Sequence, residues 1–131
     1  MIKAFAVVVA GALVSAVTPS TGYAQQMAMQ TPPSTVKSVT GTVVDLSCKF
    51  GQGLAGKDHK MCSEVCADRG IPLAVLGDDG KLYLATSAGM PGDSQNGKLK
   101  PFAEARVTVT GKVFSAAGAS AIQIDKIVAA K

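Results

Sequence analysis

Arg106-Val107-Thr108-Val109-Thr110-Gly111-Lys112-Val113 is the stretch that decides the fold, because polar and apolar residues alternate along it. Alternation with a period of two predicts a β-strand, here over residues 105–115, with its valines on the buried face. A turn at Ala117-Gly118-Ala119 follows, and residues 121–128 alternate again apart from an irregularity at Asp125-Lys126. The carboxyl-terminal part of the chain therefore predicts a β-hairpin.

Three further strands are expected upstream of this hairpin. Residues 36–46 are rich in β-branched side chains, and Gly41 within them suggests a bulge or a sharp bend. Residues 71–76 are apolar and residues 81–86 alternate, with Asp79-Gly80 between the two runs. Since Asp-Gly between such runs is a hairpin turn signal, the second and third strands should be adjacent and antiparallel.

Helical signals are confined to two connections. The first connection joins strands one and two: glycines predict a pliable loop, and residues 59–69 predict a short helix with Asp58 as its N-cap. The loop glycines are Gly51, Gly53 and Gly56. The second connection lies at residues 99–105, where Pro101 limits the chain to about one helical turn.

The strand pattern carries a family resemblance. Its two markers are Val39-Thr40-Gly41-Thr42-Val43-Val44-Asp45 and Val107-Thr108-Val109-Thr110-Gly111-Lys112-Val113. With three strands, a connection and two more strands, the chain resembles the small exported bacterial OB-fold domains over residues 36–128. The resemblance implies a mainly β fold, a small five-stranded OB-like barrel, here with one short α-helix inserted between strands 1 and 2. It implies no functional residue, since OB-like barrels serve many unrelated functions.

Residues 1–24 predict a signal peptide. Lys3 precedes an uncharged apolar run over residues 4–17, and small residues surround the expected cleavage point after Ala24. The run is shorter than the roughly 20 residues of a spanning helix, so no membrane span is expected after signal cleavage. Residues 25–35 predict a flexible tether, and residues 36–131 the OB-like barrel domain. The mature protein is therefore expected in the periplasm or outside the cell.

Composition argues against a nucleic-acid-binding protein. After the signal peptide, 12 basic and 9 acidic side chains remain, a net charge of +3, and the basic residues are scattered. A nucleic-acid surface uses a basic stripe with stacking aromatic side chains, whereas only Phe50, Tyr83, Phe102 and Phe114 remain here. The expected partner is a protein or a small ligand that the sequence does not identify.

All three cysteines and the only histidine lie between Cys48 and Cys66. On a helix, His59, Cys62 and Cys66 occupy positions i, i+3 and i+7 and share one face. Cys48 can return from the preceding loop as a fourth ligand. Three thiolates and an imidazole suit tetrahedral Zn²⁺, and the thiolates also suit Cu(I). The segment therefore predicts a metal site of three cysteines and one histidine, with a structural or a metal-handling role.

The same segment allows a disulfide instead. In an oxidising compartment, Cys48 paired with Cys62 or Cys66 would close a loop of 15–19 residues, worth about 3 kcal/mol. Met61, Cys62, Val65 and Cys66 would then form the apolar stripe by which the helix packs on the sheet. The alternative function is a disulfide-stapled module that binds a ligand or a protein without a metal. A redox role of the cysteines is a third possibility.

No residue pattern indicates an enzyme. Covalent haem attachment needs Cys-x-x-Cys-His, whereas His59 precedes both helical cysteines. Thiol oxidoreductases use Cys-x-x-Cys at the start of a helix, whereas Cys62 and Cys66 are separated by three residues. A Cys–His nucleophile would lack a third, orienting group. A non-enzymatic binding domain is therefore expected.

Overall fold

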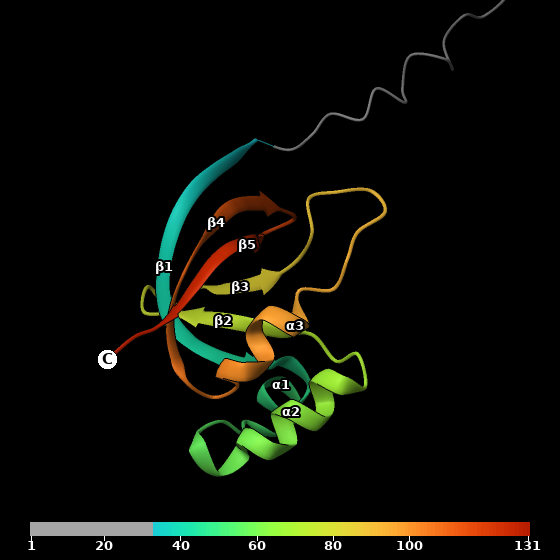
Figure 1. Ribbon diagram of the computed structural model, residues 1–131, viewed down its shortest axis with the longest axis vertical. Coiled ribbons are helices and arrows are strands. Elements are labelled where there is room, and N and C mark those ends of the chain that lie inside the picture. The colour runs from blue at the N-terminus through green and yellow to red at the C-terminus, as the bar shows by residue number, and fades with distance from the viewer. Residues whose placement is uncertain (1–32) are drawn as a thin grey trace, which may run out of the picture. The chain divides into compact units, whose positions relative to one another are not determined.

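Five strands form a closed barrel in this computed structural model, which describes residues 33–131 (Figure 1). The strands are β1 (Ser34–Asp45), β2 (Leu73–Gly77), β3 (Leu82–Ala85), β4 (Arg106–Ala116) and β5 (Ala119–Ala129). Their order around the barrel is β1-β2-β3-β5-β4, and only the β3–β5 pair is parallel. This arrangement confirms the predicted mainly β, five-stranded OB-like barrel. The predicted signal peptide and most of the tether lie outside the described residues.

β1 is long and curved, and it pairs with two neighbours (Figure 1). Residues 34–42 pair with β4, and residues 41–45 pair with β2. Gly41 lies where the partners change, and a Cβ atom there would lie 2.2 Å from the carbonyl oxygen of Leu76. The register of both ladders is continuous at this point. There is therefore no bulge at Gly41, and glycine is required there because the β2 backbone lies against it.

The β4–β5 hairpin follows the sequence pattern closely. Its turn contains Ala117 with φ of 49° and Gly118 with φ of 78°. Thr110 pairs with Lys126 while Gly111 pairs with Ile124, so Asp125 is an extra residue in β5. The irregularity expected at Asp125-Lys126 is thus a β-bulge.

The barrel interior is filled by the apolar side chains that alternate along the strands. Valine, isoleucine and leucine dominate this core, with one tyrosine and small residues from the connections. Its fully enclosed members include Val43, Leu73, Val75, Leu99, Val107, Val109, Ile122 and Ile124. Leu99 comes from the connection between β3 and β4, so that connection closes one end of the core.

Helices occupy both predicted connections. Between β1 and β2 lie α1 (Leu46–Gln52), the 3₁₀ helix η1 (Lys57–His59) and α2 (Lys60–Asp68). Between β3 and β4 lie α3 (Asn96–Leu99) and the 3₁₀ helix η2 (Lys100–Phe102). α1, α2 and α3 gather at one end of the barrel (Figure 1). Within residues 33–131, no helix has the length and apolar character needed to cross a membrane.

Two details of the first connection differ from the prediction. The pliable loop expected after Cys48 is partly wrong, because α1 continues through Gly51 and ends where Gly53 takes a left-handed φ of 68°. Asp58 is not an N-cap, since it lies inside η1 and makes no capping hydrogen bond. α2 has no side-chain cap, whereas α1 is capped by Asp45, which accepts from the N–H groups of Ser47 and Cys48. The N-cap therefore stabilises α1 as a helix although the segment contains glycine.

Two polar side chains attach α2 to the barrel. Asn96 accepts from the Leu73 N–H and donates to the carbonyl oxygens of Ala67 and Ile71, which joins the end of α2 to β2. Glu104 accepts from the Gly56 N–H and the Ser63 hydroxyl, with lengths of 2.7 and 2.6 Å. These bonds fix the position of α2, which carries two of the three cysteines.

A tyrosine–aspartate pair predicts pH-dependent stability. The Tyr83 hydroxyl donates to Oδ2 of Asp79 over 2.7 Å. This bond, with the Lys81 N–H, lowers the pKa of Asp79 below 3.8, and it raises the pKa of Tyr83 above 10. The Asp79 contribution is therefore present above pH 3.8 and lost as the pH falls through the lowered pKa. The Tyr83 contribution is present below pH 10 and lost as the pH rises through the raised pKa.

We expect Tyr83→Phe to lower the free energy of unfolding by about 1 kcal/mol at pH 7, because one hydrogen bond is lost. Urea unfolding, first at neutral pH and then in acid below the lowered pKa of Asp79, measures this difference. The difference in free energy of unfolding between the two proteins should become smaller in acid, where Asp79 becomes protonated. An equal gap under both conditions would show that the hydroxyl acts through packing and not through the carboxylate.

Candidate metal centre

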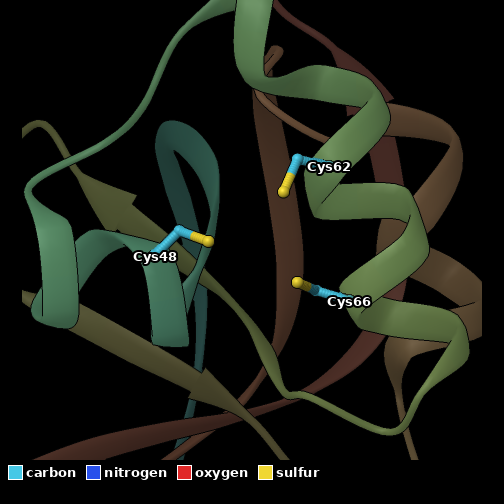
Figure 2. Close-up of side chains that lie close together, drawn as sticks. All are labelled: Cys48, Cys62 and Cys66. Carbon is cyan, nitrogen blue, oxygen red and sulfur yellow. The ribbon is translucent and has the colours of Figure 1, made fainter.

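Three thiols from two helices converge at the end of the barrel. Cys48 lies on α1, and Cys62 and Cys66 lie on the facing side of α2. Their side chains point toward one another (Figure 2). The three sulfurs lie 4.2–4.4 Å apart. The sequence predicted convergence of Cys62 and Cys66 with a returning Cys48, and the structure brings these three residues together.

Local structure explains where each thiol points. The Asp45 cap starts α1 two residues before Cys48, and the Gly53 N–H bonds to the Cys48 carbonyl oxygen at the end of the helix. On α2, Cys62 and Cys66 are four residues apart and therefore lie on one face, one turn apart. Cys48 is buried, Cys66 is half-buried and Cys62 is exposed. The cluster thus has an enclosed side at α1 and an open side at α2.

The apolar stripe expected on α2 does not pack on the sheet. Met61 is 77% exposed and Val65 is 46% exposed, whereas Ser63 and Ala67 are the buried residues of this helix. Two small side chains face the barrel because Glu104 and the strands approach α2 closely there. Cys62 and Cys66 point instead toward Cys48 on α1 (Figure 2).

His59 belongs to a second group of ligand atoms around Cys48. Its ring nitrogen, the Cys48 sulfur and a carboxylate oxygen of Asp45 all lie within 4.8 Å of one another. In the described residues, His59 does not form a common set with Cys62 and Cys66. The predicted four-residue set of three cysteines and His59 therefore stays a prediction, while its three-cysteine part is in place.

Asp45 is the site residue that sequence reasoning missed. It is 1% exposed, and one oxygen caps α1 over 2.7 and 3.2 Å. Its other oxygen, Oδ2, is buried without a hydrogen-bond partner, and so is Nε2 of His59. An Asp three residues before Cys48 was visible in the sequence as a capping signal. Its proximity to His59 was not, because that proximity depends on how the connection folds back.

Charge in the cluster is shaped by the Asp45 carboxylate. Burial alone would raise its pKa, but the neighbouring Cys66 thiol and the N–H groups of Cys48 and Ser47 more than offset this and lower it. The Cys66 thiol lies beside the carboxylate and interacts with it. The carboxylate, with burial, raises the pKa of Cys66 to about 12. Burial first and Asp45 second raise the pKa of Cys48.

These pKa directions keep Cys48 and Cys66 protonated at neutral pH without a metal. An ion that binds here must therefore displace thiol protons. All three cysteines are free in the structure, and no disulfide links the described residues.

The dimensions of the cluster suit a thiolate-bound ion. The centre of a triangle with sides of 4.2–4.4 Å lies about 2.5 Å from each sulfur, against a Zn–S bond length of about 2.3 Å. A contraction of a few tenths of an ångström per sulfur brings the thiols to bonding distance. Three converging cysteines can therefore hold a metal ion.

Comparison with known proteins adds no assignment to this geometry. No family model, curated protein or solved structure matches the chain.

Proposed function

We propose that this protein is an exported, non-enzymatic domain that binds a soft or borderline metal ion, zinc or copper(I), through Cys48, Cys62 and Cys66. His59, with a ring nitrogen within 4.8 Å of the Cys48 sulfur, is a further candidate ligand. The observation that carries the proposal is the separation of 4.2–4.4 Å among the sulfurs of three free cysteines on two helices. Thiolates favour Cu(I) and Zn²⁺ over the harder divalent ions.

The exposed edge of the cysteine cluster supports a role in metal handling rather than a purely structural role for the ion. Cys62 is exposed while Cys48 is buried, so one edge of the site is open to solvent or to a partner. Bonds that do not involve the cysteines already hold α2 to the barrel through Asn96 and Glu104. The fold therefore has other supports in this region, and an ion bound here can exchange.

Metal content is the direct test. The full chain, exported and purified under anaerobic conditions, should retain one Zn²⁺ or bind one Cu(I) in native mass spectrometry. Cys62→Ser should weaken Cu(I) binding by more than about 100-fold, beyond the 10- to 100-fold cost of losing a residue that only orients a ligand. Competition with a chelator of known affinity measures this change.

Met61→Ala is the matched control on the same helix, because Met61 is 77% exposed and directly precedes Cys62. It should bind the ion like the unaltered protein. A protein that is two hydrogens lighter than the reduced chain and binds neither ion would contradict the metal site.

A second candidate function is a disulfide-stapled module that binds a ligand or a protein. One observation favours it: an open groove of about 810 Å³ beside β3 and the β4–β5 turn. Phe50 from α1, 75% exposed, lines the groove with Leu82 and Leu84 of β3. Thiol counting under denaturing conditions separates the candidates, since one free thiol indicates the staple and three indicate the metal site.

A further inference from the structure

Two buried polar atoms beside Cys48 lack any partner. They are Oδ2 of Asp45 and Nε2 of His59. Buried polar atoms are nearly always hydrogen-bonded, and leaving one unsatisfied costs about 1–3 kcal/mol. A carboxylate oxygen of Asp45, a ring nitrogen of His59 and the Cys48 sulfur lie within 4.8 Å of one another, and together they form a ligand set for a cation. A bound ion would satisfy both atoms at once.

The two ligand sets share only Cys48. One set is Cys48, Cys62 and Cys66, with three sulfur donors, and the other is Asp45, Cys48 and His59, with oxygen, sulfur and nitrogen donors. Cu(I) gains little from a carboxylate and prefers the three thiolates. Zn²⁺ accepts carboxylate, thiolate and imidazole together, so it can also satisfy the two unpaired atoms.

We infer that the cluster binds its ions in two modes that pivot on Cys48. Cu(I) binds the three cysteines, and a borderline divalent ion such as Zn²⁺ binds Asp45, Cys48 and His59. This inference rests on the proposed metal-binding function and adds Asp45 as a ligand. Because both modes need Cys48, one ion excludes or displaces the other. The residues that bind together with Cys48 then distinguish a soft monovalent ion from a borderline divalent ion.

Two pairs of variants test the inference on the full chain, with Zn²⁺ and Cu(I) each titrated against a competing chelator. Asp45→Asn keeps the cap of α1, because Asn is an equally good N-cap, but replaces a carboxylate ligand. His59→Ala removes a ligand that makes no hydrogen bond through Nε2. Each should weaken Zn²⁺ about tenfold or more and change Cu(I) less than about threefold.

Cys62→Ser and Cys66→Ser should each weaken the binding of Cu(I) about tenfold or more and change the binding of Zn²⁺ less than about threefold. Cys48→Ser should weaken the binding of both ions. Co²⁺ in place of Zn²⁺ provides a second readout that does not depend on folding stability. Its thiolate-to-metal absorption band should have the intensity of one thiolate, and it should survive in Cys62→Ser.

Each outcome is decisive. If the variants that lose Zn²⁺ binding also lose Cu(I) binding, the two binding modes are overturned. A single centre of three cysteines and His59 would remain, and the proposed function would stand. A cobalt absorption band with the intensity of three thiolates would also overturn the two binding modes. If neither ion binds the unaltered protein, the proposed function itself fails.

Discussion

Gly111→Ala should destabilise the barrel by more than about 3 kcal/mol, above the usual cost of adding a methyl group to a packed interior. A Cβ atom at Gly111 would lie 1.9 Å from the carbonyl oxygen of Gln123 and 2.9 Å from its carbonyl carbon. Both are backbone atoms of β5, which cannot rotate away as a side chain can. Gly111 pairs with Ile124, next to the β-bulge at Asp125.

Urea unfolding followed by circular dichroism measures the effect, and a protein that does not fold would count as its upper limit. Gly51→Ala is the control, because nothing lies within 4 Å of a Cβ atom there and the residue is helical. Replacing a helical glycine by alanine should stabilise the protein by about 0.5–1 kcal/mol. A Gly111→Ala protein as stable as the unaltered chain would show that β4 and β5 can separate to accommodate the methyl group.

Glu104→Ala should lower the free energy of unfolding by about 3 kcal/mol, because hydrogen bonds to a charged group contribute about 1.5–3 kcal/mol each. It should also weaken metal binding. Glu104 is 6% exposed and accepts from the Gly56 N–H and the Ser63 hydroxyl. Alanine leaves both donors without this acceptor. Ser63 lies between Cys62 and Cys66 on α2, so release of its hydroxyl loosens the helix that carries two thiols.

A double-mutant cycle separates this role from general damage. Ser63→Ala alone removes one of the two bonds, and the double variant should be less destabilised than the sum of the single variants by about 1–2 kcal/mol. Glu104→Gln should fall between the parent and Glu104→Ala, since its amide oxygen can still accept one bond. Additive single effects would show that Glu104 acts through something other than Ser63.

Much of the fold could be predicted from local sequence patterns. Alternating or β-branched residues indicated four of the strands, since a strand with one buried face has a fixed period of two, and a short apolar run before a turn indicated the other. Asp79-Gly80 indicated the β2–β3 turn, and Asp125-Lys126 marked the bulge. These features depend on residues close together in the chain, so they can be predicted without knowing the fold.

The helical connection shows where such prediction stops. Three glycines between Cys48 and Asp58 predicted a loop, yet α1 forms because Asp45 caps it and Gly53 ends it. The apolar spacing of Met61 and Val65 predicted a packing face for α2, yet Ser63 and Ala67 face the barrel. Short elements are decided by their caps and by what they pack against, and the packing partners are distant in sequence.

By itself, the sequence determined the barrel and gathered every cysteine and the histidine into one segment. Only the tertiary structure decided how those ligands divide. The packing of α2 beside α1 placed three sulfurs 4.2–4.4 Å apart, and it grouped His59 with Asp45 and Cys48. Helical spacing fixes which side chains share a face, but distances between two helices are set by contacts such as Ser63 with Glu104 and Ala67 with Asn96. Those contacts join residues 41 and 29 positions apart, which no local pattern specifies.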